Sequence, residues 1–249
     1  MVSSEQRRRQ LAREKFERQQ QRREAARRKA RRRNTIIAAT LAVVVAAGGV
    51  AFATGAFSGD GKKSDSADPS AEPKMTVDAK AKYDMALKTN AGDIKITTDA
   101  AKTPHTVNSF KYLADKGYFD NTKCHRLTTQ NIYVLQCGDP KGTGSGGPGY
   151  TIPDEDLTGL GKAGADGTVT YRAGTVAMAN TGQPHTGGSQ FFLVYKDTKL
   201  PPSYTPFGTM DAAGLKAVQD VAKEGVEGGS TDGAPKKAVT IQKAAVTKE

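Results

Sequence analysis

The sequence predicts a mostly β protein: a closed, eight-stranded antiparallel barrel capped by two α-helices and preceded by a single N-terminal transmembrane helix. Two observations predict this class. Beyond residue 82, short alternating segments separated by turn residues recur about eight times, whereas only two segments have helical spacing. Before that body, an uncharged run of 26 residues, Asn34 to Gly59, follows an Arg-rich start.

The positive charge of the chain is concentrated in its first 34 residues. The whole sequence has 37 Lys and Arg against 26 Asp and Glu, a net charge of +11. Residues 1–34 contain 14 basic and 4 acidic side chains, so the rest of the chain has a net charge of only +1. A basic globular domain that binds nucleic acid is therefore not expected. An Arg-rich start is instead typical of the cytoplasmic flank of a membrane segment.

Residues 35–57 are predicted to form the transmembrane helix, a signal anchor. As a helix they would extend about 35 Å, enough for a hydrocarbon core of about 30 Å. The basic segment 1–34 would remain cytoplasmic, and the C-terminal body would be extracytoplasmic on a single-pass protein of the cell membrane. A cleaved signal peptide is the alternative, because Ala51-Phe52-Ala53 fits a small-x-small cleavage site. The body would then be secreted.

A flexible linker is predicted at residues 58–81, which are mainly Ser, Asp, Ala, Gly, Lys and Pro. With almost no large apolar side chains, this composition cannot bury a core. The folded domain is therefore expected to comprise residues 82–249.

The domain begins with a predicted hairpin and a helix. Residues 85–89 and 93–97 alternate in polarity on either side of Asn90-Ala-Gly92, which predicts two strands joined by a tight turn. The next segment, 104–116, has apolar residues at helical spacing, with Pro104 in the first turn and Gly117 as the stop.

The remaining elements are mostly short strands. A second helix is predicted from an Asp211 cap to Gly225. Further strands are predicted, in chain order, at 122–127, 132–136, 168–171, 175–179, 190–195 and 238–246.

One apparent cofactor motif is rejected. Residues 142–147 match the dinucleotide pattern G-x-G-x-x-G, which needs a following helix whose amides face the pyrophosphate. Pro148-Gly149-Tyr150 follows instead, so a Gly-rich surface loop is expected and no cofactor is predicted.

The two cysteines leave two possibilities open. Cys124 and Cys137 lie in one predicted hairpin of an exported domain, which favours a disulfide. Strict strand alternation would put them on opposite faces, so they could pair only if a bulge shifts the register. The nearby His125 does not complete a set of ligands at metal-binding spacing, and no metal site is predicted.

An ordered set of motifs resembles the cyclophilin family of peptidyl-prolyl cis-trans isomerases, in a membrane-anchored bacterial form. The similarity covers about residues 83–248, and a set in the family's order is far more specific than any single motif. The motifs are Cys124-His-Arg126-Leu, Gln136-Cys-Gly-Asp139-Pro, Met178-Ala-Asn180, Gly188-Ser-Gln190-Phe-Phe192 and Pro206-Phe-Gly208. The resemblance implies an eight-stranded barrel with two capping helices, in agreement with the strand count.

The resemblance also implies a site and a reaction. Arg126 would donate a hydrogen bond to the proline nitrogen during rotation of an X–Pro bond, and Gln136 would orient Arg126 and bind the substrate backbone. Main-chain groups and an apolar pocket would bind the peptide. The residues implied for substrate binding are Tyr133, Val134, Ala179, Asn180, Gln190, Phe192, Leu200 and Tyr204.

Two functions follow from this resemblance. The first is an isomerase, with a monomeric catalytic domain, that acts on proline-containing polypeptides folding outside the membrane. The second is a proline-peptide-binding chaperone or scaffold with little turnover. Departures from the family favour the second function: the 127–131 loop is extended, and Lys199 stands where the best-known members have Trp.

Overall fold

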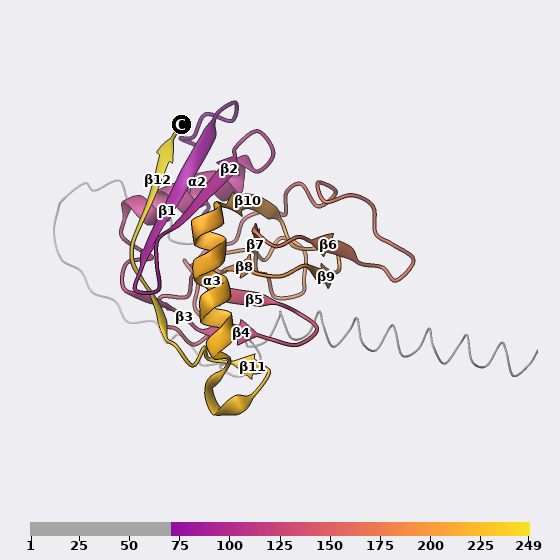
Figure 1. Ribbon diagram of the computed structural model, residues 1–249. Coiled ribbons are helices and arrows are strands. Elements are labelled where there is room, and N and C mark those ends of the chain that lie inside the picture. The colour runs from indigo at the N-terminus through magenta and orange to yellow at the C-terminus, as the bar shows by residue number, and fades with distance from the viewer. Residues whose placement is uncertain (1–70) are drawn as a thin grey trace, which may run out of the picture. The chain divides into compact units, whose positions relative to one another are not determined.

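The computed structural model describes residues 71–249 (Figure 1). The predicted basic segment 1–34 and transmembrane helix 35–57 lie outside these residues. No helix within 71–249 is both long enough and apolar enough to cross a membrane.

The described strands are β1 (Lys82–Thr89), β2 (Ile94–Asp99), β3 (Thr122–Cys124), β4 (Arg126–Thr128), β5 (Val134–Cys137), β6 (Val169–Tyr171), β7 (Thr175–Met178), β8 (Phe191–Val194), β9 (Thr198–Leu200), β10 (Pro206–Met210), β11 (Asp232–Gly233) and β12 (Val239–Lys248). The helices are α2 (Pro104–Asp115), α3 (Ala212–Glu224) and the short 3₁₀ turn η1 (Glu227–Gly229).

Ten strands form one curled antiparallel sheet. Their order across it is β11-β4-β5-β8-β7-β10-β2-β1-β12-β3, and β6 and β9 form a separate two-stranded sheet. The first and last strands of the domain, β1 in purple and β12 in yellow, lie side by side (Figure 1), with Met85 opposite Val246.

The predicted closed barrel of eight strands is wrong in strand number and in closure. The hydrogen-bonded ladder has two ends, β11 and β3, which do not pair with each other. The predicted strand 122–127 is broken at His125: β3 pairs with β12, whereas β4 pairs with β5 near the other end of the ladder. Because the sheet is curled, β3 at one end of the ladder and β4 near the other end follow each other directly along the chain. Strands β9, β10 and β11 were not predicted because they are very short or contain Pro206 and Gly208.

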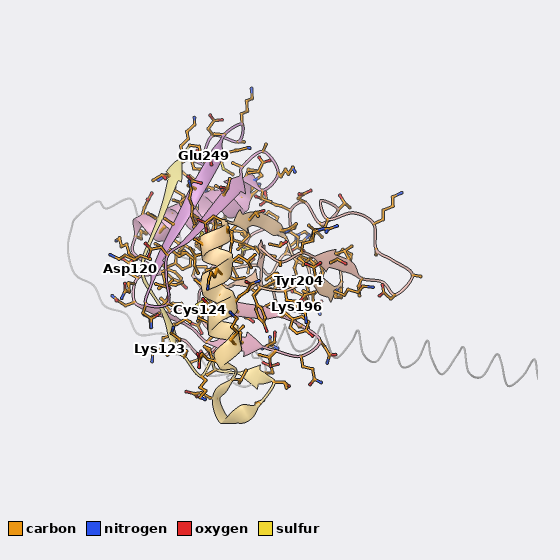
Figure 2. All side chains as sticks on the ribbon, in the orientation of Figure 1. Asp120, Lys123, Cys124, Lys196, Tyr204 and Glu249 are labelled. Carbon is orange, nitrogen blue, oxygen red and sulfur yellow. A yellow bond between two sulfur atoms is a disulfide. The ribbon has the colours of Figure 1, made fainter. Side chains whose placement is uncertain are left out.

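A disulfide links Cys124 to Cys137, with a Cα–Cα distance of 4.0 Å (Cys124 is labelled in Figure 2). The break at His125 explains how the two cysteines pair although strict strand alternation would put them on opposite faces of the sheet. Because the chain leaves the strand conformation there, Cys124 can face the core although Arg126 lies on the other side of the sheet. The bond joins β3 to β5 at the point where the ladder is interrupted.

The main hydrophobic core fills the inner face of the curled sheet. Alternation along the strands puts Leu127, Leu135 and Leu193 in one inward row, directly opposite one another on β4, β5 and β8. The helices add Phe110 from α2 and Val218 from α3. Every second residue of these strands is thereby left on the outer face.

Both predicted helices are confirmed, and their first turns are capped in different ways. Asp211 caps α3 by accepting a 2.7 Å hydrogen bond from the Gly214 amide. In α2 the cap comes from a distant loop, since the Glu155 carboxylate accepts from the amides of His105 at 3.0 Å and Thr106 at 2.9 Å. A carboxylate at a helix N-terminus also interacts favourably with the helix dipole.

The folded body begins before Lys82, where the sequence analysis placed its start. Val77 is buried in the main core. The Thr76 amide donates to Asn108 Oδ1 at 2.8 Å, and the Asp78 amide donates to the Tyr83 hydroxyl at 2.8 Å. The described end of the predicted linker is thus packed on α2 and β1.

Removal of the disulfide should lower the free energy of unfolding by about 3 kcal/mol, because the bond restricts the unfolded chain. Urea denaturation of the full chain with and without reductant measures this. A Cys124→Ser/Cys137→Ser variant should match the reduced protein and show no response to reductant. Equal unfolding midpoints for the oxidised and reduced protein would contradict the prediction.

Candidate active site

A single row of side chains crosses four neighbouring strands on the outer face of the sheet. Arg126 on β4 is directly opposite Gln136 on β5, Gln136 is opposite Phe192 on β8, and Phe192 is opposite Ala177 on β7. Directly opposed residues share a face of a sheet. The row is therefore the outward counterpart of the leucine row in the core, and it places a cation, an amide and an aromatic ring side by side.

Aromatic rings surround the apolar end of this row. The ring of Phe192 lies 5.6 Å from that of Tyr204 (labelled in Figure 2) and 6.2 Å from that of Tyr171, centroid to centroid. The Tyr171 hydroxyl donates to the Tyr204 carbonyl at 2.9 Å, which ties the loop before β10 to β6. We call Tyr171, Phe192 and Tyr204 the outer cluster. Val134 and Leu200 are also buried outside the main core.

The guanidinium of Arg126 is held at two edges. Its Nη1 donates to Gln136 Oε1 at 3.4 Å, while Nε and Nη2 donate to the two carboxylate oxygens of Asp232, each at 2.7 Å. Its charge also acts on the outer cluster. Burial raises the pKa of the Tyr204 hydroxyl to about 12, and the positive charge of Arg126 acts in the opposite direction.

Gln136 is held in turn by a second glutamine. Gln136 Nε2 donates to Gln190 Oε1 at 2.9 Å, and Gln190 Nε2 donates to the carbonyl oxygens of Gly144 and Gly146, both at 2.9 Å. Because the carbonyls accept only from the amide nitrogen of Gln190, the orientation of both side-chain amides is defined. The Oε1 atom of Gln136 therefore faces Arg126.

The Gly-rich loop that presents those carbonyls is organised around the buried Asp139 carboxylate. The Oδ2 atom of Asp139 accepts from the amides of Thr143, Gly144 and Gly146 at 2.9, 2.7 and 3.1 Å. A Cβ atom on Gly146 would collide with the Asp139 carboxylate, which explains the glycine there. The loop amides thus point to a carboxylate of the same chain, and no helix follows the loop.

These hydrogen bonds change the pKa of Asp139. Burial alone would raise the pKa of this carboxyl group, but the donated hydrogen bonds, from the Lys141 amide among others, outweigh burial and lower the pKa below 3.8. Burial lowers the pKa of His125, which faces the same loop; the negative charge of Asp139 opposes this effect and the positive charge of Arg126 adds to it. Asp139 is therefore ionised and His125 neutral at pH 7.

The structure brings most of the predicted site residues together. Arg126, Gln136 and Gln190 form one hydrogen-bonded chain, and Phe192 and Tyr204 are in ring contact beside it. The arrangement places a fixed hydrogen-bond donor near a cluster of aromatic side chains that is itself almost completely buried.

Three predicted residues make contacts within the described fold. The Ala179 amide donates to the Gln190 carbonyl at 3.0 Å, and Asn180 Nδ2 donates to the Ser203 carbonyl at 2.7 Å. Neither bond uses the Ala179 carbonyl or the main chain of Asn180, so the implied main-chain contacts to a peptide stay a prediction. Tyr133 packs against the main core, with its ring 6.0 Å from that of Tyr195.

The sequence reasoning missed three residues of the site. Tyr171 could have been found, because it is on a predicted strand and alternates with Val169. Asp139 could have been found from the glycine run that follows it, since closely spaced glycines allow several amides to turn toward one group. Asp232 gave no signal, because it is 106 positions from Arg126 along the chain.

Comparison with known proteins agrees with this geometry. The family model for cyclophilin-type peptidyl-prolyl cis-trans isomerases matches residues 84–246, which include every predicted site residue. The chain belongs to this family. As a cyclophilin it is 50% identical over 165 residues to "Probable peptidyl-prolyl cis-trans isomerase B" of Mycobacterium tuberculosis, covering 65% of this chain and 53% of the relative. The protein of the same name from Mycobacterium leprae is 47% identical over 188 residues, covering 71% of this chain and 63% of the relative.

Solved structures show the same fold. Two crystal structures of a cyclophilin-type peptidyl-prolyl cis-trans isomerase from Cryptosporidium parvum match this cyclophilin with TM-scores of 0.55 and 0.54 and 26% sequence identity. The alignments cover 68% and 67% of this chain and 99% of the parasite protein. The second of these structures was determined in the presence of the dipeptide Ala-Pro.

Replacing Asp139 with Asn should lower the free energy of unfolding by about 1–3 kcal/mol at pH 7, because an amide cannot satisfy as many backbone donors in a buried position. Urea denaturation measures the change, and Asp115→Asn, at an exposed carboxylate on α2, is the control.

The effect of Asp139→Asn should depend on pH. Because the pKa of Asp139 is lowered on folding, its contribution is complete above 3.8 and is lost as the pH falls through the lower value of the folded protein. The difference between wild type and variant should therefore shrink in acid. If the difference in the free energy of unfolding stays constant from pH 7 to well below 3.8, the lowered pKa of Asp139 is contradicted.

Proposed function

We propose that this protein is a peptidyl-prolyl cis-trans isomerase that accelerates rotation of X–Pro bonds in polypeptides folding outside the cytoplasm. The observation that carries the proposal is the row on the outer face of the sheet, in which Gln136 lies between Arg126 and Phe192 and the guanidinium of Arg126 is held by Asp232 and Gln136. Family membership and the Ala-Pro dipeptide present with the parasite relative support the same substrate class.

Rotation of an X–Pro bond needs a hydrogen-bond donor rather than a nucleophile. Rotation about an X–Pro bond breaks amide resonance and has a barrier of about 20 kcal/mol. In the twisted state the proline nitrogen regains its lone pair and accepts a hydrogen bond that the planar amide cannot. A donor fixed at that point stabilises the transition state more than the ground state, and this difference accelerates the reaction.

Arg126 has the donors that this step requires. A guanidinium carries five N–H bonds. Three of them donate to Asp232 and Gln136, so two remain for a substrate. The outer cluster is almost completely buried, so it would form the apolar backing of a proline site, and its low polarity would strengthen a hydrogen bond made at its edge.

Replacing Arg126 with Ala should lower kcat/KM by about a hundredfold to a thousandfold, the loss typical for one transition-state donor. Arg126→Lys should recover little, since an ammonium group lacks the planar fork that Asp232 and Gln136 hold. The assay follows isomerisation of a proline peptide by the full chain, and the exposed Arg172→Ala is the matched control.

Two outcomes of this assay would count against the proposal. Full activity in Arg126→Ala would reject the assigned donor. A wild-type rate equal to the uncatalysed rate, together with measurable binding of the same peptide, would favour the alternative of a proline-peptide-binding chaperone. The extended loop 127–131 and the exposed Lys199, which lies on β9 next to the buried Leu200, are the features that favour this alternative.

The proposed location is a single-pass membrane protein with its N-terminus in the cytoplasm. The Arg-rich residues 1–34 before the apolar run 35–57 support this orientation. The disulfide between Cys124 and Cys137 supports an oxidising compartment for the domain. Clients would then be proline-containing chains that fold after export.

Protease added to intact cells should remove the domain, because the proposed topology exposes it outside the membrane. Mass measurement of the mature protein should give a chain that retains residues 35–57. A soluble product starting at Thr54 would instead establish secretion after signal cleavage, and a protected domain would reject export altogether. A cytoplasmic marker protein controls for cell lysis.

A further inference from the structure

Asp232 meets Arg126 in a two-pronged contact that no comparison assigns. Its Oδ1 accepts from Nε and its Oδ2 from Nη2, each at 2.7 Å. Parallel hydrogen bonds of this kind fix the plane of a guanidinium as well as its position. The Gln136 contact, at 3.4 Å, is a longer single bond that cannot define that plane.

The backbone places Asp232 without help from its side chain. Strand β11 pairs with β4, and Asp232 is directly opposite Thr128. The loop that carries β11 is closed by backbone bonds from Glu227 to Ala234 and from Lys236 to Gly225, both of 2.9 Å. Val226, at the base of the loop, is buried in the main core. Loss of the Asp232 carboxylate should therefore leave the loop in place.

The ion pair is partly open to water. The side chains of Arg126 and Asp232 are 15% and 43% exposed, so solvent competes for the carboxylate and screens the charges. An arginine side chain also loses considerable rotamer freedom when it is held in one conformation. A short bidentate contact on a flexible cation is thus better suited to orientation than to stabilisation.

We propose that Asp232 is a positioning residue for isomerisation, one that fixes the guanidinium plane of Arg126. The inference rests on the proposed role of Arg126 as the donor. With Nε and one N–H of Nη2 bound to Asp232, the remaining N–H bonds keep a constant direction relative to the outer cluster. Without Asp232 the guanidinium would rotate about its side-chain bonds, and the donor would be in place for only a fraction of the time.

The test compares Asp232→Ala and Asp232→Asn in the full chain. Asp232→Ala should lower kcat by about tenfold to a hundredfold, as expected for a displaced catalytic group, and leave KM nearly unchanged. Asp232→Asn keeps one carbonyl acceptor and should lose less. Asp220→Ala is the matched control, because Asp220 is 42% exposed and also pairs with lysine side chains, but on α3.

Two further measurements separate positioning from a structural role. In an Arg126→Ala background, Asp232→Ala should cause no additional loss of kcat, because its effect acts through Arg126. In the wild type, the Nε–H resonance of Arg126 should be protected from exchange with solvent, and Asp232→Ala but not Asp220→Ala should remove that protection.

The outcomes distinguish failure of the positioning role of Asp232 from failure of the proposed function. Unchanged kcat in Asp232→Ala, or an equal loss in the Arg126→Ala background, would overturn the inference. An inactive wild type would instead reject the proposed function. Even then, exchange protection of the Arg126 Nε–H group would show whether Asp232 holds the guanidinium. Unchanged protection in Asp232→Ala would show that it does not.

Discussion

Strands β4, β5 and β8 are paired in one register that puts Arg126, Gln136 and Phe192 in an outward row beside an inward row of leucines. The side-chain period of a strand is two, so a slip of one residue would exchange the two rows. Such a slip would bury a guanidinium in the main core and remove the leucine side chains from it. The burial that stabilises the fold therefore also determines which residues meet at the site, and the site cannot form in another register.

Two carboxylates, at opposite ends of one hydrogen-bonded chain, support this row. Asp139 holds the Gly-rich loop, the loop holds Gln190, and the chain continues through Gln136 to Arg126. Asp232 holds the other edge of the guanidinium. Each member limits the rotation of the next. The buried Asp139 thus orients the side-chain amide of Gln190 through the backbone of the Gly-rich loop.

Much of this protein could be predicted from its sequence, and the exceptions share a physical cause. The hairpin before Asp99 and both helices were predictable because they rest on local periodicity and turn residues. The site residues Arg126, Gln136 and Phe192 were suggested instead by the resemblance to the cyclophilin family. The Glu155 cap of α2, the Asp232 contact and the break at His125 depend on pairing between distant segments.

The position of β12 has a consequence for how the domain is made. This strand pairs with β1 on one side and with β3 on the other, and it begins only at Val239 (Figure 1). A chain that is synthesised or exported from its N-terminus presents β1 with one open edge until nearly all of the domain has followed. Unpaired edges of this kind invite intermolecular pairing. The domain therefore completes its sheet only when its last segment emerges, and the timing of that release determines how long the edge is exposed.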